Sequence, residues 1–408
     1  MSVGLLDSSG LVSANSMPSF SSVMTRVMPN GEGPLFMISS MMKKKAAQNT
    51  THTFWSLTAI FQSMKLNGTP GSPTTQTTLA VFSTANVVPN QVYAIGSAVG
   101  EQVLVSSVTD STHVVVVRGV GTVTGHSMAD QDILYLVGSA QIEGSNRPTA
   151  VRIAETNVDN YTQIFRNAWA VTGSAAAVKR FVGGDVVTQD RTECAKMHVR
   201  DIEYALMFGQ PINTTIGGVP FRKLRGIVEE CRLNSRITTA GSTTNYSQLE
   251  AALDPCFNYN SDPAIGNKRI LFVGGGAKKV INAIGRNSGT GSNAIQYQLT
   301  QGQTTFGLQF DTFNISRGSF DMIEHPLLTQ NAVFTMMAIA VDFGGLSVPY
   351  LGGRDTLAEE YSVDGSGAMR QVADSGQDAI GGSLLTELTL ENRTPFANQC
   401  ITNLTAFG

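Results

Sequence analysis

The chain has 408 residues, of which 42% are hydrophobic and only 14% are charged, and its formal net charge is −3. A chain of this length and composition can bury more than one core, and it is not disordered. The nearly balanced charge excludes a strongly basic protein that compacts nucleic acid. Because soluble domains usually carry about 25% charged residues, the deficit indicates that much of the surface is covered by something.

The cysteines and histidines form no metal-binding pattern. The histidines, at positions 52, 113, 126, 198 and 325, are scattered along the chain. The four cysteines form no C-x-x-C pair and are equally scattered: Cys194, Cys231, Cys256 and Cys400. We therefore expect neither a metal nor a cofactor.

The sequence contains no signal for membrane insertion or secretion. The first residues, MSVGLLDSSGLVSANS, lack a basic region ahead of an apolar run, and no stretch reaches about 18 apolar residues. We therefore expect no contact with a membrane, synthesis in the cytoplasm and reduced cysteines.

Residues 1–50 are rich in Ser, Met and Gly and have no sustained hydrophobic period. This composition predicts an extended arm that becomes ordered on a partner. Near its end lie Lys43, Lys44 and Lys45. They could contact nucleic acid or a neighbouring chain, although so short a charge run is more often a solvated face.

Residues 51–165 predict a long hairpin with an insertion at its tip. Thr53–Lys65 is apolar and aromatic, as expected of a strand, and a second strand returns near residues 150–165. Between them, residues 79–142 are dense in β-branched side chains with closely spaced turns, and the module is expected at about residues 86–142. This pattern predicts a small antiparallel sheet or barrel of its own.

The strongest helix signal covers residues 185–208, from the N-cap candidate Asp185 to Gly209, with Pro211 following. At about 1.5 Å per residue the helix would span about 36 Å. Its predicted packing face follows the 3.6-residue period: Val187, Ala195, Val199, Ile202 and Leu206. His198 lies beside this face, so a partly buried or interfacial histidine is a better interpretation than a catalytic base.

The C-terminal half predicts a compact α+β domain over residues 241–345, in which strands alternate with short helices. Residues 216–240 look like a connection with some strand character. Residues 332–343 are expected to form a strand, and residues 384–404 alternate on both sides of Asn392–Pro395, as a closing hairpin would.

Residues 271–285, LFVGGGAKKVINAIG, raise the possibility of a phosphate-binding loop, because glycines and a helix N-terminus can hold an anion. The spacing does not fit. A dinucleotide loop would need glycine at the position of Lys279, and a nucleoside-triphosphate loop would need Ser or Thr after Lys278. An ordinary strand, turn and helix is therefore favoured over a nucleotide site.

No group of residues in the sequence predicts an active site. The sequence contains no G-x-S-x-G motif, and no histidine lies in a motif that would pair it with a nucleophile. The carboxylate pairs Glu229–Glu230 and Glu359–Glu360 are adjacent in sequence, so their side chains point in different directions. We do not expect an enzyme.

Several separated motifs resemble the major capsid proteins of tailed bacteriophages, in particular a branch whose hairpin loop carries an extra β module. In the first half they are EGSNRP (143–148), YTQIFRNAWAVTGSA (161–175), HVRDIEYALMFG (198–209) and FRKLRGI (221–227). In the second half they are GLQFDTF (307–313), IEHPLL (323–328), PYLGGRD (349–355), SGQDAIGG (375–382) and TLENRTPFANQCI (389–401). The resemblance covers about residues 55–404; the glycine triplet at 274–276 departs from it.

The resemblance implies the α+β Hong Kong 97-like capsid fold and suggests four regions. They are an N-terminal arm (1–50), an extended loop with an inserted small β-barrel (51–165), a peripheral domain on a long spine helix (166–240 and 346–408), and an axial domain (241–345). The chain would assemble with itself into hexamers and pentamers of an icosahedral shell. Such rings bury charge-poor surface between subunits.

By the same resemblance, the shell belongs to a virion and encloses double-stranded DNA without sequence-specific binding. A portal protein is an expected partner, and scaffolding and decoration proteins are possible ones. Lys278 and Lys279 would then be solvated, pair with a neighbouring subunit or line the axis of a ring. Two alternatives remain: an α/β nucleotide-binding enzyme that uses residues 271–285, and a phage tail or fibre protein, which would not explain the long helix.

Overall fold

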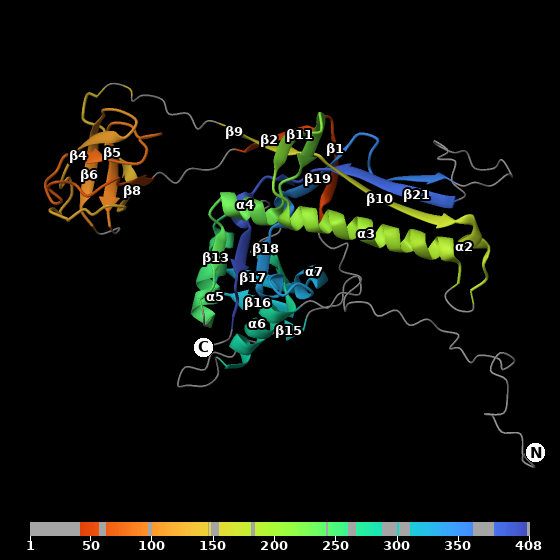
Figure 1. The fold of residues 1–408 in the computed structure, drawn as a ribbon. Helices are drawn as coiled ribbons and strands as arrows, with labels where there is room; N and C mark the ends of the chain where they lie inside the picture. The colour runs from red at the N-terminus through yellow and green to blue at the C-terminus, as the bar shows by residue number, and fades with distance from the viewer. Residues whose placement is uncertain are drawn as a thin grey trace, which may run out of the picture. The chain divides into compact units, whose positions relative to one another are not determined.

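A computed structural model describes residues 41–56, 63–96, 100–145, 147, 155–180, 184–241, 244–259, 267–287, 300–301, 311–361 and 379–405. The chain divides into two compact units, one made of Met1–Phe54 with Asp159–Gly408 and the other of Trp55–Val158 (Figure 1). None of the helices in these ranges combines the length and the apolar character needed to cross a membrane.

The first unit contains a six-stranded sheet with the long helix α3 (Val186–Phe208) packed along it (Figure 1). The central strand order is β1 (Lys43–Ala47), β19 (Leu346–Leu351), β21 (Ala379–Leu388) and β10 (Gln163–Thr172). Two further strands pair at its margins, β20 (Leu357–Tyr361) with β21 and β22 (Glu391–Asn392) with β19.

Helix α3 begins and ends at the residues that the sequence predicts. The Asp185 carboxylate accepts a hydrogen bond from the Thr188 amide at 2.8 Å, which satisfies one of the free N–H groups of the first turn. At the other end, a Cβ on Gly209 would lie 2.6 Å from the Leu224 carbonyl oxygen. Glycine is therefore required where the chain after the helix passes against its last turn.

A seven-stranded sheet forms the second layer of this unit. Its strand order is β13 (Ile237–Thr239), β23 (Gln399–Thr402), β18 (Ala338–Val341), β14 (Lys268–Val273), β17 (Gly318–Glu324), β16 (Asp311–Ile315) and β15 (Thr300–Gln301). Alternate side chains of β14 enter two cores: Phe272 packs in the core that contains α3 residues, and Leu271 and Val273 pack in the core that contains α5 and α6 residues. Helix α5 spans Tyr246–Leu253 and α6 spans Gly275–Asn287.

Shorter elements complete the first unit. They are α2 (Gly173–Ala177), the hairpin β11 (Ile212–Ile216) and β12 (Val219–Lys223), α4 (Ile227–Leu233), α7 (Pro326–Thr329), and the 3₁₀ turns η3 (Asp254–Asn258), η4 (Phe334–Met336), η5 (Phe343–Gly345) and η6 (Pro395–Ala397). Strands β2 (Thr51–Ser56) and β9 (Thr156–Tyr161) pair where the chain leaves the first unit and returns to it.

The second unit is a six-stranded sheet, here called the β3–β8 module. Its order is β3 (Ser63–Lys65), β8 (Ile133–Ser139), β5 (Gln91–Ile95), β6 (Gln102–Val108), β7 (His113–Val117) and β4 (Thr78–Ala80). An antiparallel bridge between Leu66 and Val81 joins the chain after β3 to the chain after β4, so the strand order closes on itself. The module has its own core, which includes Tyr93, Val103 and Leu134.

The module is larger than the predicted range of about 86–142, because β3 and β4 lie before it. The glycine and proline residues at 68–73 lie in a loop. They separate two three-residue strands that are too short to show an alternating pattern.

Three other sequence interpretations are wrong in whole or in part. Residues 384–404 do not form a hairpin, because β21 pairs with β10, β19 and β20, whereas β23 pairs with β13 and β18 in the other sheet. Residues 216–240 have the expected strand character in β12 and β13, but they are not only a connection, because they also contain helix α4. Strand β18 is preceded by the turn η4 rather than by more strand. Alternation predicts that a segment is a strand, but it does not specify the strand's partner.

The predicted arm spans residues 1–50, of which residues 1–40 lie outside the described residues. Its last part is not an extended arm, since Lys43–Ala47 pairs in parallel with β19 as strand β1. Met42, directly before this strand, is buried in the core with residues of α3.

Candidate functional site

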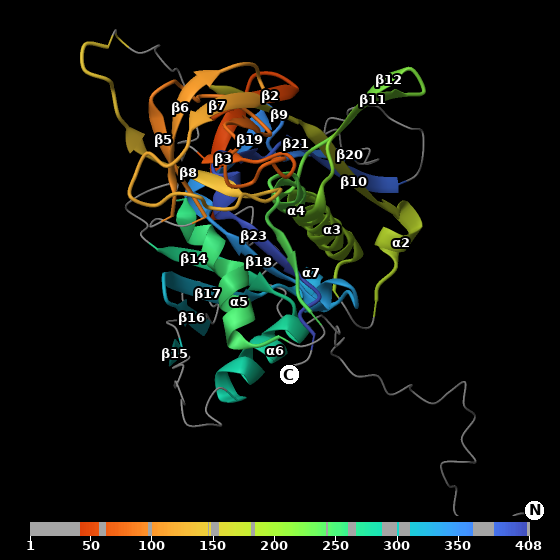
Figure 2. The same ribbon diagram turned by 90° about the vertical axis from the view of Figure 1, so that its left-hand side faces the viewer.

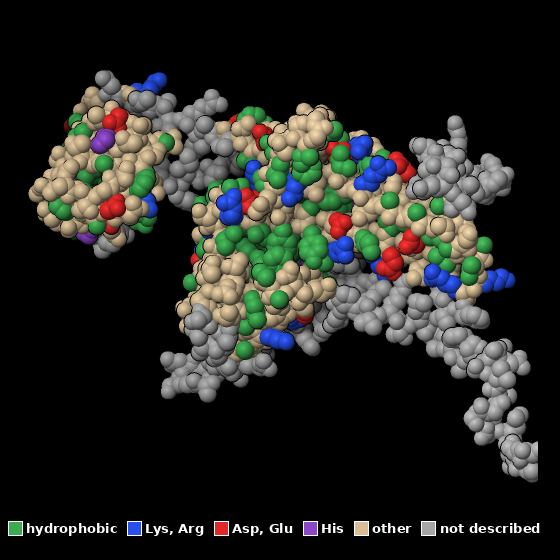
Figure 3. Space-filling view, viewed as in Figure 1, with side chains coloured by type: hydrophobic (Ala, Val, Ile, Leu, Met, Phe, Trp, Pro, Cys, Tyr) green, Lys and Arg blue, Asp and Glu red, His purple; other side chains and the backbone are tan. Residues whose placement is uncertain are grey.

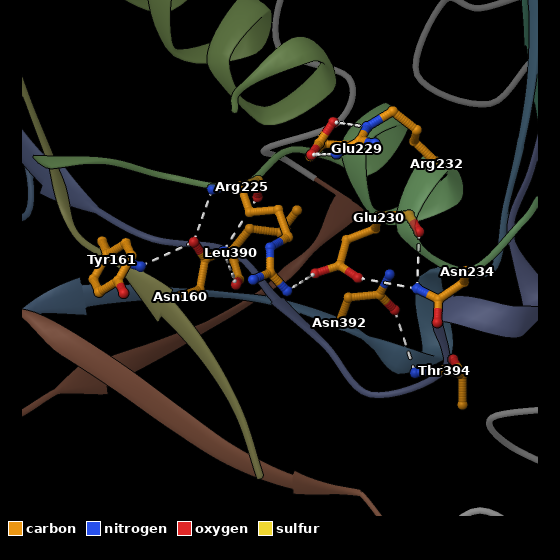
Figure 4. Close-up of polar contacts among 10 residues, drawn as sticks. All are labelled: Asn160, Tyr161, Arg225, Glu229, Glu230, Arg232, Asn234, Leu390, Asn392 and Thr394. Atoms are coloured by element: carbon orange, nitrogen blue, oxygen red, sulfur yellow. Dashed lines mark hydrogen bonds and ion pairs between the residues drawn. The ribbon is translucent and has the colours of Figure 1, made fainter. Parts of the chain in front are cut away.

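The described residues contain no group of three or more His, Cys, Asp or Glu side chains placed to hold a metal ion. The carboxylate pair Glu229–Glu230 lies in α4, and Figure 4 shows the two side chains pointing to different partners. Glu229 receives hydrogen bonds from Arg232 at 2.5 and 2.8 Å, and Glu230 receives one from Arg225 at 3.2 Å.

The pKa values of the two carboxyl groups shift in opposite directions. Hydrogen bonding from Arg232 lowers the pKa of Glu229, whereas burial raises the pKa of Glu230 despite the nearby Arg225. Because each carboxylate is engaged by its own arginine, the two do not face a shared point where a substrate could bind.

The same cluster joins three segments that are distant in sequence (Figure 4). The Asn160 side chain, at the end of β9, donates to the carbonyl oxygens of Arg225 at 3.1 Å and Leu390 at 2.7 Å, and it accepts from the Arg225 amide at 2.7 Å. Asn160 is 1% exposed. Its contacts fasten the returning strand of the β2–β9 ribbon to the segment before α4 and to the segment before β22.

A second buried cluster holds the other strand of the ribbon. Glu391, in β22, lies 3.2 Å from Lys45 of β1 and 3.1 Å from Nε2 of His52 in β2, and it also receives a hydrogen bond from Arg393. The hydrogen bond from His52, with those from Arg393 and Lys45, lowers the pKa of Glu391 far below its ordinary value. An ionised carboxylate therefore ties β1 and β2 to β22.

The predicted lysines of the arm are thus engaged within the chain. Lys45 binds Glu391, and Lys44 lies 3.3 Å from Asp355 with its Nζ 4.9 Å from the centre of the Tyr350 ring. Lys43, at the start of β1, is exposed.

The glycine corner at residues 274–276 is a strand, turn and helix, as predicted. Its free amides are already used: Gly275 donates to the Thr329 hydroxyl and Gly276 to the Thr335 hydroxyl, each at 3.0 Å. A phosphate would have to displace both hydroxyl groups from the N–H groups that it needs. Of the two lysines, Lys278 lies 4.0 Å from Glu324 and Lys279 is exposed.

The packing face of α3 differs in part from the predicted one. Ile202 and Leu206 are buried, as predicted, but Val187 and Val199 are only half-buried. His198 is 2% exposed instead. It lies four residues before Ile202, so the two side chains share one side of the helix, and a hydrophobicity pattern does not detect a buried histidine.

Polar partners explain how His198 is buried. Its Nδ1 lies 2.8 Å from the Asn167 side-chain oxygen in β10, and its Nε2 lies 2.8 Å from the Thr386 hydroxyl in β21. Burial lowers the pKa of His198, which favours the neutral ring. The histidine therefore attaches α3 to the sheet and is not exposed for catalysis.

The β11–β12 hairpin exposes an apolar surface that the sequence analysis missed. Figure 2 shows it standing clear of the other strands of its unit. In the observed register, Ile216 pairs with Val219, and Phe221 pairs with Thr214 on the same side. Four large side chains on this side form the apolar hairpin face, with the following exposures: Ile212 40%, Ile216 60%, Val219 64% and Phe221 40%.

Polar residues occupy the opposite side of the hairpin, including Asn213, Thr215 and Arg222. Alternation of this kind is typical of a sheet with one buried side, yet the apolar side is exposed in the single chain. A two-stranded ribbon is at best marginally stable in water without such packing. The hairpin therefore has the properties of an interface element.

Comparisons with known proteins agree with an assembly role. A protein-family model described as SU10 major capsid protein matches residues 7–405. The curated "Major capsid protein" of Pseudomonas phage PaMx41 is 30% identical over 396 residues, which cover 95% of this chain and 92% of that protein.

Two solved structures also resemble this chain. One, from Microbacterium phage Oxtober96, has 10% identity and a TM-score of 0.47, with 97% of this chain and 99% of that chain covered. The other, the holo-SrpI encapsulin complex from Synechococcus elongatus PCC 7942, has 9% identity and a TM-score of 0.45, with 96% and 95% covered. On the strength of the family match and the Pseudomonas phage relative, each spanning nearly the whole chain, this protein belongs to the SU10 major capsid protein family.

Proposed function

We propose that this protein is the subunit from which a tailed bacteriophage builds the icosahedral shell around its double-stranded DNA. The family match over residues 7–405 carries this proposal. The chain's low charge and its exposed apolar hairpin face support it, because subunits in closed rings bury charge-poor surfaces against several neighbours.

The architecture is consistent with a Hong Kong 97-like subunit. In this proposal the β2–β9 ribbon is the root of the extended loop, and the β3–β8 module is its inserted barrel. Helix α3 and the six-stranded sheet form the peripheral domain, and the seven-stranded sheet with α5 and α6 forms the axial domain. Hexamers and pentamers would be the rings of the shell.

The apolar hairpin face is the proposed contact between subunits. Burying four large apolar side chains would favour association by about 25 cal/mol for each Å² of apolar surface removed from water. Lys43 and Lys279, which are exposed, remain candidates for polar contacts at such interfaces. Lys44, Lys45 and Lys278 are weaker candidates, since each has an acidic partner within the chain.

The net charge of −3 supports a wall that surrounds DNA without binding it tightly. A portal protein is part of the proposal, as are synthesis and assembly in the host cytoplasm. Scaffolding and decoration proteins would be further partners.

Substitutions in the hairpin test the proposal. Phe221→Ser with Ile216→Ser should leave the subunit folded, because both side chains are exposed, but should reduce shell formation, as seen by electron microscopy and sedimentation. Asn213→Ser with Thr215→Ser, on the opposite side, is the matched control. Normal shells from the apolar-face variant would contradict the proposed role of the hairpin.

A further inference from the structure

The outer surface of the β3–β8 module has an apolar ridge on strand β8. Ile133 of this strand is 38% exposed, Tyr135 52% and Val137 54%; Leu136 is 36% exposed where the register against β5 shifts, whereas Leu134 is fully buried. We call Ile133, Tyr135 and Val137 the β8 ridge. An outward strand face normally carries polar residues in a sheet that meets water.

The ridge continues onto the neighbouring strands. Lys65 of β3 pairs directly with Ile133, and its Nζ lies 5.5 Å from the centre of the Phe82 ring. Phe82 is 52% exposed. The apolar surface therefore extends from Val137 along β8 and across Lys65 to Phe82, and contiguous patches of this kind mark interaction sites.

Few charged groups surround this surface. Six residues of Trp55–Val158 are acidic and four are basic, out of the 104 in the unit. Figure 3 accordingly shows few red or blue side chains on the face of the unit that it presents. Ten charged residues in 104 are well below the roughly 25% that is usual for a soluble domain, and a low charge is typical of surfaces that other proteins cover.

The charges next to the ridge are mainly negative. Asp130 and Asp132 lie directly before β8, and Glu143 follows it. One carboxylate oxygen of Asp130 accepts from the Gly68 amide at 2.6 Å, and one of Asp132 accepts from the Ala129 amide at 2.7 Å. These bonds hold the two carboxylates at the start of the ridge.

The β11–β12 hairpin has the complementary character. Residues 210–223 contain Arg222 and Lys223 and no acidic residue. Lys223 pairs with Ile212, so it lies at the margin of the apolar hairpin face. Arg222 lies on the opposite side of the hairpin. The hairpin thus offers an apolar strip next to one cation, and the β8 ridge offers an apolar strip next to carboxylates, which favours their association.

We propose that the apolar hairpin face of one copy of this chain docks on the β8 ridge of another copy. This contact rests on the proposed shell function and specifies which surfaces meet. Apolar burial stabilises it, and the pairing of Lys223 with Asp130, Asp132 and Glu143 selects the partner surface and its orientation. Each copy would use its hairpin and its module on different neighbours, which is the head-to-tail arrangement that closes rings.

Disulfide cross-linking between two variants tests the contact. One full-length variant carries Tyr135→Cys and the other Ile216→Cys, and the two are mixed before assembly and oxidised in the shells. The native cysteines are all buried, so they do not compete. Because each copy carries only one of the new thiols, a disulfide between the two sites must join two copies.

The expected result is a covalent dimer in the mixed shells that is absent from shells of either variant alone. If the Ile216→Cys shells cross-link by themselves, or if normal mixed shells give no dimer, the docking proposal is wrong although the shell function stands. If neither the variants nor the unmodified chain forms shells, the proposed shell function is wrong, and the proposed docking contact is wrong as well. Should either variant misfold by circular dichroism, Val137→Cys with Val219→Cys provides a second pair on the same surfaces.

Discussion

At the scale of single residues, buried charges in this protein serve to hold segments together. Glu391 and Lys45 are separated by 346 positions, and Glu101 and Arg118 by 17. Arg269 and Asp342 are both almost fully buried and lie 3.6 Å apart. A buried charge requires such a partner, since removing one member leaves the other uncompensated.

The Glu101–Arg118 pair predicts how the β3–β8 module responds to pH. Arg118 donates to both carboxylate oxygens, at 2.8 and 2.7 Å, and the amides of Gly119 and His126 donate as well. These bonds, led by those of Arg118, lower the pKa of Glu101 below its ordinary value of 4.5. The stabilisation is therefore complete above that ordinary pKa and is lost as the pH falls through the lower, folded-state pKa.

Arg118→Met should destabilise the module by about 3–5 kcal/mol at neutral pH, because it leaves a buried carboxylate unpaired. Hydrogen exchange of peptides from β5, β6 and β7 would measure this loss. Lys65→Met is the control within the same module, since the exposed cation–ring contact contributes only about 0.5–1 kcal/mol. Equal hydrogen-exchange protection in Arg118→Met and Lys65→Met would show that the Glu101–Arg118 pair does not stabilise the module.

The packing face of α3 leads to a second residue-level prediction. Ile202→Asp would place an unpaired charge at a side chain that is 8% exposed, so it should lower the free energy of unfolding by several kcal/mol, on the order of 3–5. Met197→Asp, where the side chain is 49% exposed, should cost far less. Denaturant unfolding measures both, and similar losses would mean that this face does not carry the packing of the helix.

The residue-level errors of the sequence analysis have a physical cause. Ile202 and Leu206 are predictable because an apolar period reports the core. His198 is buried because Asn167 and Thr386 satisfy both ring nitrogens, and these partners lie 31 and 188 positions away. Polar contacts between residues that are distant in sequence produce no local sequence pattern. The clusters around Glu391 and Asn160 could therefore not be predicted either.

At the scale of elements, the glycine corner shows how tightly the chain packs at the start of α6. A Cβ on Gly274 would collide with the backbone of Thr335, whereas a Cβ on Gly275 would lie 3.0 Å from the end of the Thr329 side chain and 3.2 Å from that of Glu324. Backbone atoms cannot move aside as the end of a side chain can.

Gly274→Ala should therefore destabilise the subunit by about 1–3 kcal/mol or more through overpacking. Gly275→Ala should be close to neutral, because alanine favours the helix by about 1 kcal/mol over glycine and offsets the tighter contact. Thermal unfolding compares the two variants. If Gly275→Ala proved the more harmful, the corner would be packed differently from this description.

Elements with complete local signals were predictable, and elements defined by distant partners were not. Helix α3 has an N-cap aspartate, an apolar period and a terminal glycine within one stretch. The C-terminal alternation predicts strands, but β21 and β23 pair in separate sheets with five other strands: β10, β19 and β20 for β21, and β13 and β18 for β23. The exposed β11–β12 hairpin was missed because its Gly217–Gly218 turn lies in a segment interpreted as a connection.

At the scale of the whole molecule, the N-terminal segment provides a test of assembly without loss of folding. Deleting residues 1–40 keeps β1, its pairing with β19 and the Lys45–Glu391 contact, so the subunit should fold with unchanged stability. Its shells should dissociate at lower denaturant concentration if the segment binds neighbouring subunits. Fully stable shells would reject that role.

Deleting residues 1–47 is the matched comparison, because it also removes β1 and the buried Met42. This variant should unfold more easily even as a single subunit. If the two deletions unfold alike, β1 does not support the sheet.

The assembly state of the purified protein tests the central claim most directly. Cryo-electron microscopy of the expressed chain, alone and with candidate scaffolding and portal proteins, should show closed icosahedral shells built from rings of this subunit. Monodisperse monomers under every assembly condition would contradict the claim that this protein forms the shell.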